Sequence, residues 1–254
     1  MHGKQLVGSQ PGVFMKLLVA YLTVGYPTPK AFLELVKHIE SAGVDVVELG
    51  IPPRFAKYDG PLIRKSYEHV KSLGIDYWAL LKEARRAVEV PIVVLTYLEE
   101  FENIFASLVD KLNSIGVDSL LLPDLLIDYA SSYENYLEMA RDVGVTLFTS
   151  PSMPDKLIER VAPLSKLFLY YGIRPATGIP IPVDPVVLVK RVRALVKNRL
   201  IVGFGLSLNE VVDVLKACAD GIAVGSVLIQ LIESSGVEAV VKLLKELRGV
   251  IDGV

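Results

Sequence analysis

Glu48 is the side chain whose type and position most clearly suit chemistry. It lies near the end of the stretch VDVVELG, residues 44–50, and the alternation of a strand puts it on the same face as Val44 and Val46. If this face lines an apolar interior, burial raises the pKa of the carboxyl, which suits a group that gives and takes a proton near neutrality. The alternative is that Glu48 points outward and pairs with a cation on a helix.

Asp59 is a second carboxylate, in the triplet Asp59-Gly60-Pro61. Aspartate is a common helix cap and proline suits a first helical turn, so a structural role is one interpretation. The stretch before it, GIPPRFAKY over residues 50–58, is long and proline-rich, and long loops in a compact domain are more often functional than idle. On this second interpretation Asp59 joins Glu48 as one acid–base pair.

Eight short apolar runs must position these carboxylates. The expected strands cover residues 17–22, 44–49, 91–96, 119–122, 145–148, 166–170, 200–204 and 221–224. Each is followed by a segment of helical period, for example residues 31–43, 104–116 and 207–220. Strands that are apolar throughout and separated by helices are typical of a parallel sheet covered on both faces.

The count of these units predicts the fold class. Eight βα units in a chain close to the roughly 250 residues of such folds predict an α/β fold, a single (β/α)8 TIM barrel with extra helices. It covers residues 1–254, with 1–14 as a tail or an extra N-terminal segment. Three helices end in a glycine that can take a left-handed conformation: Gly43, Gly116 and Gly144. A Rossmann-type sheet is the main rival, but residues 21–29, YLTVGYPTP, lack its glycine fingerprint.

Composition excludes several classes of protein. The formal net charge is −2 with well-mixed signs, so neither a nucleic-acid face nor a membrane patch is expected. The longest apolar run, residues 221–232, is shorter than the roughly 20 residues that cross a bilayer. Residues 1–16 lack the apolar segment of a signal peptide, and the single cysteine, Cys218, fits a reducing compartment. We therefore expect a cytoplasmic protein.

Barrel enzymes carry their active residues at the carboxyl ends of the strands. Residue types that are missing there therefore exclude several kinds of reaction. The three histidines, His2, His38 and His69, lie in the tail or on expected helices, so no metal site is expected. No lysine ends a strand, which argues against a Schiff-base aldolase, and no P-loop or GxSxG motif occurs. Acid–base chemistry by carboxylates, helped by tyrosine hydroxyls, remains.

The last two expected strands are followed by helix starts that suit an anion. Gly205 precedes a helix expected from Ser207, and Gly225 and Ser226 open a short helix after the eighth strand. Backbone N–H groups at helix starts bind phosphate, and this place in a barrel is a recurring phosphate site. Each glycine alone could serve close packing or a turn; as a pair they predict phosphate binding.

These segments together resemble the tryptophan synthase alpha chain family over nearly the whole chain after Met15. The resembling motifs are AYLTVGYP (20–27), VELGIP (47–52), DGP (59–61), PIVVLTY (91–97), LLPDL (121–125), YYG (170–172), TG (177–178), GFGLS (203–207) and DGIAVGS (220–226). The VELGIP and DGP pair is the most specific, because other phosphate-binding barrels share the last two motifs.

The resemblance implies a lyase of tryptophan biosynthesis that cleaves indole-3-glycerol phosphate to indole and glyceraldehyde 3-phosphate by metal-free retro-aldol chemistry. The implied roles are acid–base catalysis (Glu48), acceptance of the indole N–H (Asp59), substrate orientation (Tyr170, with Tyr171 as the alternative), substrate binding (Tyr21, Thr96 and Thr177) and phosphate binding (Gly178, Gly205, Gly225 and Ser226). It implies no cofactor in this chain, and pyridoxal phosphate only in a β-subunit partner.

Two loops depart from the family's usual pattern: residues 53–58 read PRFAKY and residues 97–100 read YLEE. In the family these segments normally contact the β subunit, so a looser or transient complex is expected here. A complex stable to dilution on size-exclusion chromatography would contradict that expectation.

Two rival functions stay open. One is another phosphate-binding barrel enzyme, an indoleglycerol-phosphate synthase or a sugar-phosphate isomerase. The synthase would need a lysine at a strand end, and the isomerases usually need an aspartate where the first strand here has Tyr21. The other is a non-catalytic barrel that binds or activates a β partner.

Overall fold

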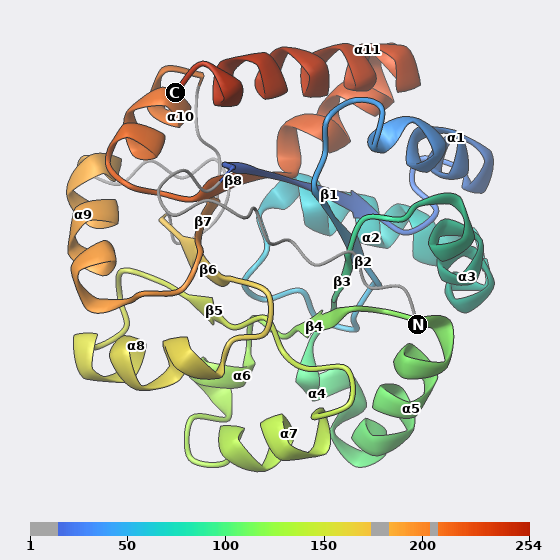
Figure 1. Ribbon diagram of the computed structural model, residues 1–254. Helices are drawn as coiled ribbons and strands as arrows, with labels where there is room; N and C mark the ends of the chain where they lie inside the picture. The colour runs from blue at the N-terminus through green and yellow to red at the C-terminus, as the bar shows by residue number, and fades with distance from the viewer. Residues whose placement is uncertain (1–14, 174–182, 204–207) are drawn as a thin grey trace.

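The computed structural model describes residues 15–173, 183–203 and 208–254. In this part of the chain eight parallel strands form a nearly closed barrel within a ring of helices (Figure 1). The strands are β1 (Leu17–Thr23), β2 (Val46–Gly50), β3 (Ile92–Leu95), β4 (Ser119–Leu121), β5 (Phe148–Thr149), β6 (Leu169–Gly172), β7 (Leu200–Gly203) and β8 (Gly221–Val224). The predicted TIM barrel is confirmed.

The helices lie between and after the strands along the chain. The α-helices are α1 (Pro29–Ile39), α2 (Pro61–Ser72), α3 (Tyr77–Ala87), α4 (Leu98–Phe101), α5 (Phe105–Ile115), α6 (Leu125–Asp128), α7 (Tyr133–Met139), α8 (Asp155–Val161), α9 (Pro185–Leu195), α10 (Leu208–Lys216) and α11 (Ser226–Asp252). Two 3₁₀ helices, η1 (Glu102–Ile104) and η2 (Ala162–Leu164), extend α4 and α8. No helix in the described ranges is long and apolar enough to cross a membrane.

The strands neighbour one another in the order β4-β3-β2-β1-β8-β7-β6-β5, and a bridge between Leu120 and Val145 joins the two ends of the sheet. There the Leu120 N–H donates to the Gly144 carbonyl at 3.0 Å, and the Thr146 N–H donates to the Leu120 carbonyl at 2.9 Å. The fifth strand therefore differs from its predicted range, residues 145–148. Its first residues contribute only this bridge, and the ladder with β6 begins at Phe148.

Burial on both faces explains the apolar composition of the strands. All seven residues of β1 and all five of β2 are buried, as a parallel sheet covered by helices requires. The helices contribute one apolar stripe each; in α1 the buried residues are Phe32, Leu35, Val36 and Ile39. The three predicted turn glycines, Gly43, Gly116 and Gly144, all have the expected positive φ, between 78° and 87°.

Three aspartates at the amino ends of strands hold together the end of the barrel opposite to the carboxyl ends of the strands. Each accepts hydrogen bonds from a backbone N–H at or next to the start of the preceding strand and from an arginine: Asp45 with Leu18 and Arg248, Asp118 with Ile92 and Arg85, and Asp220 with Leu200 and Arg193. The donor–acceptor distances are 2.7–2.9 Å. These contacts fix the strand starts relative to one another, so that the strand ends can hold a rigid site.

A short helix follows β8, as predicted. The helical residues Ser226–Asp252 of α11 form two helices that meet at Gly236, whose φ of 82° and ψ of −174° are not helical. The segment after Gly236 packs Val240, Leu244, Leu247 and Ile251 inward, so it closes the outer layer over β1. The first turn of α11 lies at the carboxyl end of β8, where the sequence predicts a phosphate site.

Candidate active site

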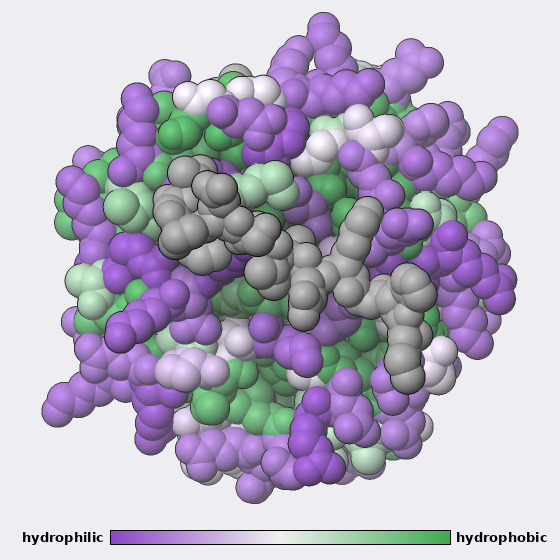
Figure 2. All heavy atoms as spheres, viewed as in Figure 1, coloured by the Kyte–Doolittle hydropathy of each residue, from purple (hydrophilic) through white to green (hydrophobic). Residues whose placement is uncertain are grey.

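One cavity at the carboxyl ends of the strands brings most of the predicted residues together. Six predicted residues line it: Tyr21, Glu48, Asp59, Tyr170, Gly225 and Ser226. Its walls are otherwise mostly apolar, which lowers the local dielectric and makes each buried charge costly. Figure 2 shows hydrophilic side chains around the rim of this end of the barrel, with apolar residues nearer its centre. Within the described residues no cluster of His, Cys, Asp and Glu is arranged to hold a metal ion.

Glu48 lies at the inner wall of this cavity, near the end of β2. It is paired in register with Tyr21 on β1 and Val93 on β3, and its side chain is 3% exposed. Burial, and after it the negative charge of Asp59, raise the pKa of the Glu48 carboxyl to about 8. Glu48 therefore faces inward, as the strand alternation with Val46 predicts, and holds a proton at neutral pH.

Asp59 reaches the same cavity from the loop between β2 and α2. Its carboxylate accepts a hydrogen bond of 2.9 Å from the Tyr97 hydroxyl and is 8% exposed. Burial raises the pKa of Asp59 to about 7, while the Tyr97 hydrogen bond and the positive charge of Arg64 oppose the rise. When Asp59 is ionised, its negative charge helps to keep the proton on Glu48. The helix-cap interpretation fails, because α2 has Gly60 at its N-cap.

Two tyrosines, Tyr21 and Tyr170, line the cavity together with the carboxylates, and two glycines make room for them. A β-carbon at Gly50 would overlap the Tyr21 hydroxyl, and one at Gly203 would overlap the Tyr170 hydroxyl. The Tyr21 hydroxyl is also in hydrogen-bond contact with Thr23 at 3.0 Å. The rings are thereby held against the barrel wall, where each presents an apolar surface to a ligand.

The structure distinguishes between neighbouring residues that the sequence left ambiguous. Tyr170 lines the cavity, whereas Tyr171, the next residue along β6, is fully buried away from it. Thr96 is not among the lining residues: its hydroxyl donates to the Ile51 carbonyl at 3.3 Å, and Leu95 lines the cavity in its place. Thr96 directly follows the last residue of β3, and the substrate-binding role predicted for it stays a prediction.

The opposite end of the cavity has the features of an anion site. Gly225 is the N-cap of α11, and the first amides of a helix have no intrahelical partner. The Ser226 hydroxyl oxygen is buried, and no group in the described part of the chain forms a hydrogen bond with it. The other predicted residues of this end, Thr177, Gly178 and Gly205, lie outside the described residues.

Sequence reasoning missed several functional neighbours of the carboxylates. Leu95, Leu121 and Phe148 form much of the apolar wall, and Tyr97 holds Asp59. Tyr97 follows Thr96 just after the end of the third strand, and this position alone could have marked it as a candidate site residue. Its partner lies 38 residues away in the sequence, and no local pattern indicates that contact.

The raised carboxyl pKa values predict how stability depends on pH. A folded-state pKa near 8 for Glu48 means that the native protein keeps a proton which the unfolded chain has lost above about pH 4.5. The free energy of unfolding should therefore fall as pH rises from about 5 to 8, by up to roughly 1.4 kcal/mol per pH unit for one proton.

Glu48→Gln removes the carboxyl group that releases a proton when the protein unfolds. We expect thermal unfolding scans to show the variant gaining stability over the parent as pH rises from 5 to 8.5. Glu83→Gln, at an exposed glutamate of α3, is the matched control. The difference in stability between this variant and the parent should stay the same from pH 5 to 8.5. A parent and a Glu48→Gln variant with parallel pH profiles would contradict the raised pKa.

Comparison with known proteins identifies what this architecture is similar to. Residues 14–251 match the family model described as tryptophan synthase alpha chain. Alpha chains from Saccharolobus solfataricus and Sulfurisphaera tokodaii are 47% and 46% identical over 240 residues, covering 93% of this chain and 97% and 98% of theirs. A chain of the tryptophan synthase α2β2 complex from Pyrococcus furiosus superposes with a TM-score of 0.78 at 27% identity, covering 94% of this chain and 100% of that one.

Proposed function

The chain belongs to the tryptophan synthase alpha chain family, and from this premise we propose that Glu48 and Asp59 are the acid–base pair of its reaction. The protein is the alpha subunit of tryptophan synthase, a lyase that cleaves indole-3-glycerol phosphate in tryptophan biosynthesis. The observation that carries the proposal is that two buried carboxyl groups line one mostly apolar cavity and that burial raises the pKa of both.

Glu48 supplies the proton that starts the cleavage. Protonation of the indole C3 by the Glu48 carboxyl makes that carbon tetrahedral and leaves positive character on the ring nitrogen. The glycerol hydroxyl next to C3 then gives its proton to the Glu48 carboxylate while the carbon–carbon bond breaks. The bonding electrons return to the ring, so indole and glyceraldehyde 3-phosphate form and Glu48 regains its proton. A carboxyl with a pKa of about 8 suits a group that acts in both directions.

Asp59 stabilises the charge that develops between these steps. Its carboxylate accepts the indole N–H, and this interaction strengthens as the ring nitrogen becomes positive, which is the kind of contact that lowers a barrier. Burial raises the pKa of Asp59, and the Tyr97 hydrogen bond and Arg64 oppose this rise in favour of the ionised form. Tyr170 orients the substrate, and Tyr21 with Leu95 forms the wall against the indole ring.

The phosphate of the substrate binds at the first turn of α11, on Gly225 and Ser226. The free amides, the helix dipole and the unpartnered Ser226 hydroxyl oxygen support this assignment. We propose that Thr177, Gly178 and Gly205, outside the described residues, belong to the same substrate and phosphate region.

Glycerol 3-phosphate should protect this end of the cavity from hydrogen exchange. We expect exchange of the Ser226 amide to slow at saturating ligand, because a phosphate bound to this N–H keeps water away from it. Ser226→Ala should weaken binding about tenfold, the loss expected for one hydrogen bond to a charged group. Ser234→Ala, at an exposed serine of α11, is the control. Protection confined to another face of the barrel would contradict the assignment.

The partner of this chain is the tryptophan synthase β subunit. Pyridoxal phosphate belongs to that subunit, and we propose that the alpha chain itself works without a cofactor and in the cytoplasm. That the complex is looser than usual stays a prediction. The family match sets aside the rival interpretation as another phosphate-binding barrel enzyme.

A further inference from the structure

The loop that carries Asp59 ends in a β-turn whose two central residues are Lys57 and Tyr58. The Asp59 N–H donates to the Ala56 carbonyl at 3.3 Å, and α2 begins two residues after Asp59. One long hydrogen bond holds such a turn only weakly. The position of the Asp59 carboxylate therefore depends on what fixes the two central residues.

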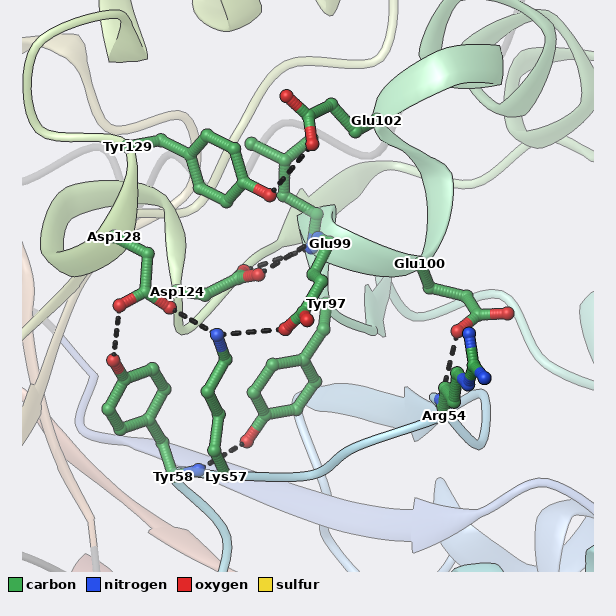
Figure 3. Close-up of polar contacts among 11 residues, drawn as sticks. Arg54, Lys57, Tyr58, Tyr97, Glu99, Glu100, Glu102, Asp124, Asp128 and Tyr129 are labelled. Carbon is green, nitrogen blue, oxygen red and sulfur yellow. Dashed lines mark hydrogen bonds and ion pairs between the residues drawn. The ribbon is translucent and has the colours of Figure 1, made fainter.

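Lys57 is fixed by carboxylates from two other loops. Its Nζ lies 2.8 Å from Glu99 Oε2, on α4 after β3, and 2.7 Å from Asp128 Oδ2, at the end of α6 after β4. Figure 3 shows the ammonium between these two side chains. A single cation thus joins the loop of β2 to the loops of the next two strands.

Tyr58 is fixed by the same aspartate and by an aromatic neighbour. Its hydroxyl donates to Asp128 Oδ1 at 2.7 Å, so the two oxygens of Asp128 hold the two central residues of the turn. The Tyr58 ring stacks on Tyr97 with centroids 6.2 Å apart and planes 10° apart. This aromatic contact adds to the ion pairs that hold the turn.

The Tyr97 hydroxyl connects this arrangement to Asp59. It accepts a hydrogen bond from the Tyr58 N–H at 3.0 Å and donates to the Asp59 carboxylate at 2.9 Å. The backbone of the turn and the carboxylate at its end are therefore held by one atom. Displacement of the turn would lengthen both contacts together.

The helices that carry Glu99 and Asp128, the acceptors of the turn, are themselves held in place. Asp124 accepts the N–H groups of Leu98 and Glu99 at 2.9 and 3.0 Å, which ties the start of α4 to the start of α6 (Figure 3). Hydrogen bonds to Asp128 and then to Glu99 raise the pKa of Lys57, so the cation keeps its charge in the neutral range. The contacts form one network between three neighbouring loops.

We propose that Lys57 and Tyr58, held by Asp128 and Glu99, are positioning residues that hold the Asp59 carboxylate at the indole end of the cavity. The inference rests on the proposed role of Asp59. Two of the three segments of the network, residues 53–58 and 97–100, are those in which the sequence departs from the usual pattern of its family. In this chain they are occupied by residues that bind one another, so the barrel itself supplies the contacts that hold the loop.

A double-mutant cycle separates positioning from general damage. Lys57→Met removes the charge and keeps the apolar stem; we expect kcat for indole release to fall about tenfold with KM changed less than twofold, because misplacement of a catalytic group slows the chemical step. In an Asp59→Asn background the same change should cost less than twofold, since Lys57 acts through Asp59. Lys57→Arg should restore kcat to within threefold.

Lys242→Met is the matched control, because Lys242 forms an exposed ion pair with Glu246 on α11. It should leave both constants unchanged. A tenfold loss for Lys57→Met in both backgrounds, or no loss in either, would overturn the inference while leaving the proposed function intact.

Hydrogen exchange gives a readout that does not depend on turnover. The Tyr58 and Asp59 amides should exchange faster in Lys57→Met and in Asp128→Asn than in the parent or in Lys242→Met. If the parent releases no indole, the proposed function fails. Unchanged exchange in the two variants would then show separately that the network does not hold the loop.

Discussion

Glu48→Gln is expected to lower kcat for indole release by about 10³-fold, within the range that general acid–base groups supply. Glutamine has nearly the shape of the protonated carboxyl that burial favours at this position, so the variant should fold with its cavity intact. It cannot give a proton to the indole C3 or accept one from the glycerol hydroxyl. The loss should therefore appear in kcat, with KM nearly unchanged.

Steady-state assays of the purified variant check this, together with its affinity for glycerol 3-phosphate. Glu83→Gln, at an exposed glutamate, serves as the control for loss of a carboxylate elsewhere. A Glu48→Gln variant that keeps its fold and turns over within threefold of the parent would remove Glu48 from the mechanism.

Asp59→Asn is expected to lower kcat by about 10²-fold, the loss seen when one group that stabilises a developing charge is removed. The asparagine oxygen can still accept the Tyr97 hydrogen bond, so the loop should keep its position. What disappears is the negative charge opposite the indole nitrogen. The asparagine variant should also lower the pKa of Glu48, because the charge of Asp59 helps to raise it.

The activity of Asp59→Asn as a function of pH checks both consequences. We expect the descending limb of kcat against pH, which reports loss of the Glu48 proton, to move to lower pH in the variant. Tyr97→Phe is the informative comparison, since it keeps the Asp59 charge and removes its hydrogen bond. If Tyr97→Phe loses as much activity as Asp59→Asn, then placement of the carboxylate matters more than its charge.

Much of this site follows from the sequence because its residues stand on regular elements. The alternation of Val44, Val46 and Glu48 is sufficient to turn Glu48 inward once a barrel is expected. The anion site could be predicted for the same reason, because Gly225 and Ser226 directly follow β8 and begin a helix. In both places local pattern and fold class determine the direction of the side chain.

Other parts of the site depend on contacts that no local pattern carries. The third strand is apolar throughout and Thr96 directly follows it, so no polar–apolar alternation indicates that Leu95 faces the cavity; the register with β2 and β4 decides it. The network around Lys57 joins residues up to 71 positions apart. Its existence depends on how three loops fold together.

The most direct test of the account is to measure indole and glyceraldehyde 3-phosphate together after mixing the purified chain with indole-3-glycerol phosphate. The account predicts that the parent forms both products in equal amounts, and that Glu48→Gln forms neither at a comparable rate while still binding glycerol 3-phosphate. Absence of both products from the parent, with and without an added β subunit, would contradict it. Equal rates from parent and Glu48→Gln would contradict the assignment of the proton to Glu48.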